Sequence, residues 1–224
     1  MDASDREQIR ERIRKQQDFI EEHGKRVATN LRRADRLIEI AEKRFPSRNR
    51  DDIQAKDDML RAAVVLLHAT LEDYLRYIGF KYIPSGGEEV LNKISLIGGP
   101  DRPEKFFLGK LAKHRGKTVD QLITESVEAH LDKRSFSNTA DISQLLESAR
   151  VPSAKVEAFF PSLQELMDTR HEIVHKGDLT ATIDQEGERV PKAIDASKVT
   201  EWSNTIQRFT STVAAYKMEM GDLG

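Results

Sequence analysis

Apolar and small residues recur at intervals of three and four along most of this chain, the spacing that lines one face of an α-helix. Over residues 5–45 such a row alternates with Arg, Glu, Lys and Gln, which predicts one long amphipathic helix with Gly24 as a candidate kink. A second row covers residues 51–82. Its middle, VVLLHATLEDYL, is apolar around most of the helix circumference, so we expect this helix at the centre of the core.

The rest of the chain predicts shorter elements. Gly and Pro residues after the second helix mark turns and a loop. The elements predicted beyond them are a helix over 118–131 with Thr118 and Gln121 as a capping box, helices over 142–149 and 153–176, a small β-hairpin over 179–194, and a closing helix over 199–216. No Gly/Ser-rich or Pro-rich linker divides the chain. The prediction is therefore an all-α helical bundle that forms a single domain over residues 1–224, in which residues 1–50 hold the long N-terminal helix.

Composition narrows the classes of function. The 36 Lys and Arg residues nearly balance 38 Asp and Glu residues, so no global field attracts the 224-residue chain to nucleic acid or to a membrane, and any such binding must be local. The absence of cysteine excludes disulfide frameworks, thiol nucleophiles and cysteine-ligated metal sites.

The first residues are polar and charged, which does not fit a secretory signal with an apolar centre. The most apolar run, residues 62–71, is about half the roughly 20 residues that a membrane-spanning helix needs. These features predict a cytoplasmic protein with no membrane partner.

One segment is locally basic. Residues 105–117 contain five Lys or Arg residues and His114, with no acidic residue among them. A surface that contacts phosphate groups through Lys113, Arg115 and Lys117 is one interpretation. The alternative is a group of cations at a helix end and its loop.

The helix over 153–176 places an arginine on its inward face. Its predicted buried row comprises Leu163, Leu166, Met167 and Val174, and Arg170 falls in the middle of that arc. An unpaired buried guanidinium is too costly, so Arg170 must pair, bridge to a partner chain or face a site. Its partner within the chain could be Glu72 or Asp73, which, like His68, we expect to be boundary residues of the second helix rather than catalysts.

Two histidines lie on one flank of the same helix, four residues apart. Residues 171–175 read H-E-I-V-H, a formal match to the H-E-x-x-H pattern of zinc hydrolases. No histidine follows His175, so a third zinc ligand could only be Glu186, Glu188 or Glu201. A zinc hydrolase is therefore the lesser alternative.

Three segments carry a resemblance to a known family. HATLEDYLR (68–76), SFSNTADISQLLESARV (135–151) and LQELMDTRHEIVHKGD (163–178) resemble the HEPN superfamily, in particular its RiboL-PSP-HEPN or MAE-type branch. The most specific feature is the R-x4–6-H motif, which Arg170 and His175 match, with His171 at a position where the family commonly has Asn, Asp or His. The resemblance covers the chain from the second helix to the closing one, and the long first helix is less clearly part of it.

The resemblance implies an all-α bundle, often dimeric, that acts as a metal-independent RNase in toxin–antitoxin, abortive-infection and other defence systems. It also implies that Arg170 and His175 form the catalytic pair with His171 in support, and that no cofactor is needed. We expect Lys176 beside the motif, with Lys113, Arg115 and Lys117, to contact RNA, and a cognate antitoxin is a further expected partner. Some members have lost catalysis, so a silent module that binds RNA, nucleotide or a protein is the main alternative.

The chemistry of RNA fits this assignment. RNA supplies its own nucleophile, the 2′-hydroxyl, so cleavage needs a group of near-neutral pKa to move protons and a fixed cation to stabilise the developing charge. The products would be a 2′,3′-cyclic phosphate and a 5′-hydroxyl. Residues five apart on a helix point about 140° away from each other, so Arg170 and His175 of one chain meet poorly. A homodimer with a shared cleft resolves this.

Overall fold

The computed structural model describes residues 3–46, 49–98, 108–177, 179–183 and 189–220. Its elements are α1 (Ala3–Arg44), α2 (Arg50–Tyr82), α3 (Glu88–Leu91), α4 (Val119–Lys133), α5 (Thr139–Ser148), α6 (Phe160–Lys176) and α7 (Ala196–Glu219), the 3₁₀ helices η1 (Leu108–His114), η2 (Ser153–Lys155) and η3 (Glu157–Phe159), and the strands β1 (Leu179–Ile183) and β2 (Arg189–Pro191). The strands pair antiparallel. The predicted all-α bundle with a small hairpin is confirmed.

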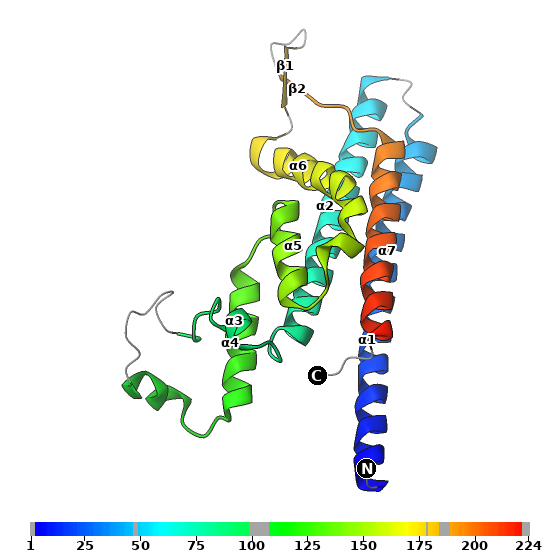
Figure 1. Ribbon diagram of the computed structural model, residues 1–224. Helices are drawn as coiled ribbons and strands as arrows, with labels where there is room; N and C mark the ends of the chain where they lie inside the picture. Colours follow the sequence, from blue (N-terminus) through cyan, green and yellow to red (C-terminus); the bar gives the residue numbers. More distant parts are fainter. Residues whose placement is uncertain (1–2, 47–48, 99–107, 178, 184–188, 221–224) are drawn as a thin grey trace.

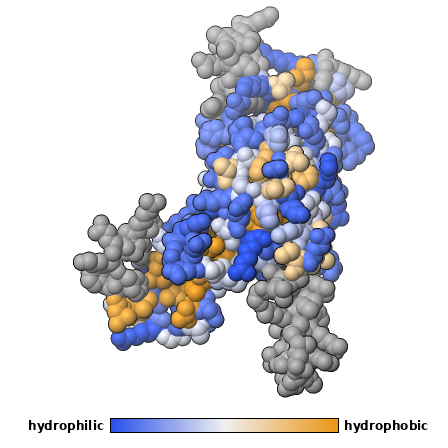
Figure 2. Space-filling view, in the orientation of Figure 1, coloured by the Kyte–Doolittle hydropathy of each residue, from blue (hydrophilic) through white to orange (hydrophobic). Residues whose placement is uncertain are grey.

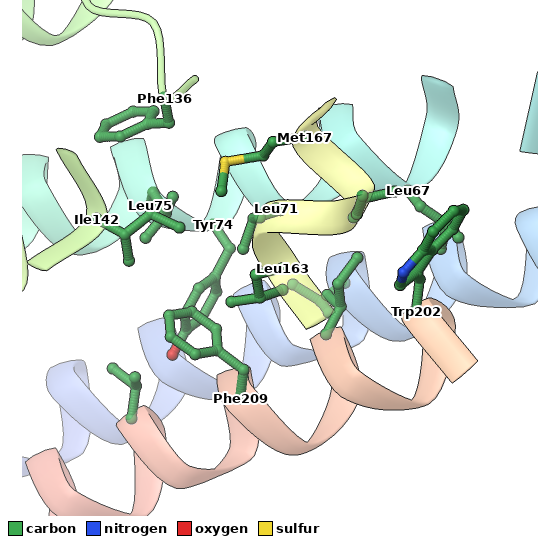
Figure 3. Close-up of a cluster of buried hydrophobic side chains, with 14 of the residues drawn as sticks. Leu67, Leu71, Tyr74, Leu75, Phe136, Ile142, Leu163, Met167, Trp202 and Phe209 are labelled. Carbon is green, nitrogen blue, oxygen red and sulfur yellow. The ribbon is translucent and has the colours of Figure 1, made fainter. Parts of the chain in front are cut away.

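Helix α2 lies at the centre of the bundle, as predicted. It contacts α1, α4, α5, α6 and α7, and α1, α2 and α7 run side by side (Figure 1). Its buried residues Leu67, Leu71 and Leu75 are fully enclosed. Figure 3 shows Leu163 of α6 between Leu71 of α2 and Phe209 of α7, and the ring of Tyr74 of α2 beside that of Phe209, so α2 packs against both α6 and α7.

Side-chain caps fix where several helices begin. The Thr118 hydroxyl accepts the N–H of Gln121, and the Gln121 side chain accepts the N–H of Thr118, which confirms the predicted capping box of α4. The Asn138 side chain accepts the N–H of Asp141. Because Asn138 caps α5, this helix begins three residues before the predicted residue 142.

The helix predicted over 153–176 begins later than expected. Residues 153–159 form two 3₁₀ turns, and the regular helix α6 starts only at Phe160. Pro161 explains the difference, because proline lacks an N–H and fits the first turn of an α-helix but not its interior. Helix α1, in contrast, continues through Gly24 as one helix.

Candidate active site

The R-x4–6-H motif occupies the last two turns of α6. Arg170 is half-buried, whereas His171 and His175 are exposed. The two imidazole rings lie close together, with centroids 4.8 Å apart and planes 45° to each other. Gly177 ends the helix in the left-handed conformation, with φ 63°, and its N–H donates to the carbonyl of Glu172. The motif is therefore carried by a regular helix with a fixed end.

The apolar row beside Arg170 is only partly buried. Leu163, Leu166 and Met167 are enclosed as predicted, but Val174 is 47% exposed, so its predicted burial is wrong. The row keeps its phase along the helix, and Val174 is exposed because the last turns of α6 extend beyond the helices that cover the earlier ones (Figure 1). An apolar side chain thus lies at the surface one turn after Arg170.

The two carboxylates considered as partners of Arg170 bind other groups. Glu72 accepts the backbone N–H of Phe136 at 3.2 Å and pairs with Arg76 at 3.5 Å. Asp73 pairs with Arg26 at 2.6 Å. Within the part of the chain that the structure describes, no hydrogen bond or ion pair joins Arg170 to either carboxylate.

Arg170 instead lies near a buried histidine of α2. His68 is 4% exposed, and its Nε2 is 3.3 Å from the carbonyl oxygen of Phe136. Burial lowers the pKa of His68, Glu72 raises it in part, and the positive charge of Arg170 lowers it further. The Nε2 of His68 has a hydrogen-bond partner, as expected of a satisfied residue, but His68 is buried rather than at the boundary, and its electrostatic interaction with Arg170 was not predicted. The two residues are about a hundred positions apart in the sequence, so only the fold could show this contact.

The structure does not bring the basic segment to this motif within one chain. Residues 108–117 lie at the end of the molecule opposite α6, beyond α4 (Figure 1). Figure 2 shows a hydrophobic surface at that end, where Leu108 and Val119 are exposed. Lys113 donates to the carbonyl of Gly98, and Lys117 pairs with Glu125. Lys105 and the Lys176 side chain lie outside the described parts of the chain.

Nothing in the described residues supports the zinc alternative. Glu172 of the H-E-x-x-H match pairs with Lys192. Of the candidate third ligands, Glu186 and Glu188 lie outside the described residues, and Glu201 pairs with Lys198. No group of three or more His, Asp or Glu side chains in the described ranges is placed to hold a metal ion. Nor is any helix in those ranges long and apolar enough to cross a bilayer.

Comparison with known proteins identifies the family. The RiboL-PSP-HEPN family model matches residues 29–214, a range that includes α2, the loop before α5 and the Arg170–His175 motif. The match starts within α1, so the second half of the long first helix is also covered, which is more than the sequence resemblance indicated. Searches of curated proteins and of solved structures gave no significant match. The matched range is most of the chain, and the protein belongs to the RiboL-PSP-HEPN family.

Proposed function

We propose that this protein is a metal-independent endoribonuclease that acts in the cytoplasm as a toxin or defence effector. Family membership points to a nuclease or another RNA-related function. The observation that supports the finer proposal is the arrangement at the end of α6, where a half-buried arginine lies beside two exposed histidines. Cleavage by the RNA 2′-hydroxyl requires a cation and groups that can accept and donate a proton, and arginine and histidine side chains supply these.

The residues have distinct roles in this proposal. His175 accepts the proton of the 2′-hydroxyl, which attacks the adjacent phosphorus, and the bond from phosphorus to the 5′-oxygen breaks. Arg170 stabilises the charge that develops on the phosphate oxygens. His171, whose ring centroid lies 4.8 Å from that of His175, supports the orientation of His175, and His175 returns the proton to the leaving 5′-oxygen. The products are a 2′,3′-cyclic phosphate and a 5′-hydroxyl.

A homodimer would complete the site. Arg170 and His175 point to different sides of α6, and within the described residues no direct contact joins them. Val174 lies exposed on the same face as Arg170, so a second copy packed along this face would bury Val174 and bring the two motifs together. The dimer therefore accounts for an exposed apolar side chain and a half-buried arginine with one contact.

The test is RNA cleavage by the purified protein with and without EDTA. We expect cleavage that survives EDTA, leaves cyclic phosphate ends and disappears in Arg170→Ala and His175→Ala. Arg36→Ala and His130→Ala are matched controls that remove the same side chains from α1 and α4, and they should cleave RNA normally. Activity that EDTA abolishes would contradict the proposal.

A folded dimer that binds RNA without cutting it would instead support the catalytically silent module. A cognate antitoxin would be sought as the product of a neighbouring reading frame. Its co-expression should suppress the cleavage or the toxicity of this chain.

A further inference from the structure

The loop between α4 and α5 is fixed to α2 through the backbone of one residue, Phe136. Glu72 accepts the N–H of Phe136 at 3.2 Å, and His68 lies 3.3 Å from its carbonyl oxygen. The two α2 residues are four apart and therefore share a face of that helix. Both backbone polar groups of a single loop residue are thus bound by side chains from the same element.

The ring of Phe136 anchors the same loop. It is fully buried, and Figure 3 shows it beside α2, across from Met167 of α6. The guanidinium groups of Arg76 and Arg134 lie over the ring, 5.9 Å and 5.5 Å from its centroid. Arg76 also donates to the carbonyl of Arg134 at 3.0 Å. The loop is therefore fixed by the ring and backbone of Phe136 and by the backbone of Arg134.

The bond to the carbonyl defines the tautomer of His68. A carbonyl oxygen only accepts hydrogen bonds, so Nε2 of His68 must carry the hydrogen. Because burial keeps the pKa of His68 below its usual value, the ring is neutral near pH 7 and Nδ1 has no proton. His68 thus donates its Nε2 hydrogen to the carbonyl oxygen of Phe136.

This fixed loop lies next to the proposed active site. Arg170 follows Met167 by three residues on α6 and shares its inward face, and Figure 3 shows Met167 and Phe136 over neighbouring turns of α2. Gln164 of α6 also accepts the N–H of Thr139, which follows this loop, at 3.0 Å. The positive charge of Arg170 lowers the pKa of His68, so the guanidinium lies within electrostatic range of the residue that binds the Phe136 carbonyl. Ser135 and Ser137, on either side of the buried Phe136, are both exposed. Their hydroxyl groups can donate hydrogen bonds to phosphate oxygens.

We propose that His68 and Glu72 are positioning residues that hold the Phe136 loop as the second wall of the RNA site, opposite Arg170. The inference rests on the proposed ribonuclease function. It assigns Ser135 and Ser137 to binding of the phosphodiester backbone and gives His68 and Glu72 no direct part in proton transfer. The loop contributes by fixing where the RNA backbone lies relative to Arg170.

Glutamine and leucine substitutions separate positioning from chemistry. His68→Gln keeps an N–H donor near the position of Nε2, and Glu72→Gln keeps an oxygen that can accept the Phe136 N–H. Neither glutamine can transfer a proton at neutral pH. We expect both glutamine variants to cleave RNA within about threefold of the wild-type kcat, and His68→Leu and Glu72→Leu to lose about tenfold or more, because small displacements of a substrate are costly.

Hydrogen exchange at the Phe136 amide gives a readout that does not depend on cleavage. The amide should exchange slowly in the wild type and in the glutamine variants, and faster in the leucine variants. Leucine variants that exchange fast but cleave normally would overturn the proposal. Glutamine variants that keep the amide protected but lose cleavage would also overturn it, because His68 or Glu72 would then take part in the chemistry.

A further variant tests the proposal even if the leucine variants fail to fold. The double variant Ser135→Ala, Ser137→Ala leaves the contacts of Phe136 intact, and we expect it to raise KM about tenfold with kcat retained. An unchanged KM would overturn the assignment of the loop to the RNA site. If the wild type binds RNA but does not cut it, the proposed function fails, and the RNA affinity of this double variant then decides the role of the loop: weaker binding supports it and equal binding refutes it.

Discussion

Two ends of the molecule carry the cations that could contact RNA, and they differ in what those cations touch. At the η1 end, Lys113 and Lys117 bind a backbone carbonyl and a glutamate of their own surroundings. At the α6 end, Arg170 is half-buried beside His68, and its two carboxylate candidates are bound to other groups. Within the described residues, Lys113 and Lys117 of the segment with more positive charge thus already have local partners. We therefore expect the position and partners of each cation, rather than the local density of Lys and Arg, to decide which end contacts RNA.

The largest expected difference between the two ends is in the effect on RNA cleavage of removing one cation from each. We expect Arg170→Ala to lower kcat/KM for RNA cleavage by about 10²–10³-fold, because a fixed charge at the transition state is removed. Arg115→Ala, at the η1 end, should change it by less than about twofold because Arg115 is exposed. Single-turnover cleavage of a labelled RNA measures both. Equal losses in the two variants would mean that the two ends contribute alike.

A substitution of Val174, the exposed apolar residue of α6, should have the next largest effect on cleavage. Val174→Glu should convert the proposed dimer into monomers and reduce cleavage by about tenfold or more, since a like-charged pair at an isologous contact is repulsive. Val119→Glu is the matched control, because Val119 is also exposed but lies on α4, toward the η1 end. Sedimentation velocity gives the oligomeric state. A Val174→Glu variant that remains dimeric would place the dimer contact elsewhere.

Charge reversal at the η1 end tests whether this end contributes to RNA binding. We expect the double variant Lys113→Glu, Arg115→Glu to weaken RNA binding by less than about threefold at roughly 0.15 M salt, and to leave the slope of log Kd against log salt nearly unchanged. The slope reports how many phosphates are neutralised, so a decrease of about two would show that both residues contact RNA after all. Fluorescence anisotropy over a salt series provides the measurement.

The smallest expected effect is on the pH dependence of folding stability, through the buried His68 near Arg170. Burial places the pKa of His68 below its ordinary value of 6.5, with Glu72 and Arg76 facing it from α2 and Arg170 from α6. The unfolded chain therefore takes up a proton at a higher pH than the folded chain, and stability is lost as pH falls through and below 6.5. The contribution of one proton is at most about 1.4 kcal/mol per pH unit.

Denaturant unfolding at several pH values tests this effect. His68→Gln should flatten the dependence between about pH 7 and pH 5 relative to the wild type. The variant is compared with the wild type because burial also lowers the pKa of His23 and His130, which contribute in the same direction. If the difference in stability between the two proteins is the same at every pH, protonation of His68 is not its cause.

The sequence was sufficient for features that depend on nearby residues. The row of apolar positions predicted α2 as the central helix, and Thr118 with Gln121 predicted the start of α4. The start of α6 could also have been predicted from Pro161, since proline favours the first turn of a helix. The resemblance carried by the spacing of Arg170 and His175 predicted the HEPN superfamily, which the family match confirms.

Features set by distant neighbours could not be predicted. Val174 keeps the phase of a buried row, and its exposure depends on where the packed helices end in space. The contacts of Phe136 join a loop to a helix more than sixty residues away, and they involve backbone atoms, which leave no side-chain pattern in the sequence. The sequence therefore did not predict that the Phe136 loop binds α2, although SFSN contains an aromatic residue between two serines.

The attachment of the Phe136 loop to α2 also determines when during synthesis the site can exist. Residues that define the site lie between His68 and His175, so a growing chain has no complete site until α6 has left the ribosome and packed on α2. Such non-local contacts form late in folding, because the intervening loop must first be closed. If the chain cuts RNA as proposed, it is inactive until α6 has packed on α2, and incomplete products that end before α6 cannot cleave the RNA around them.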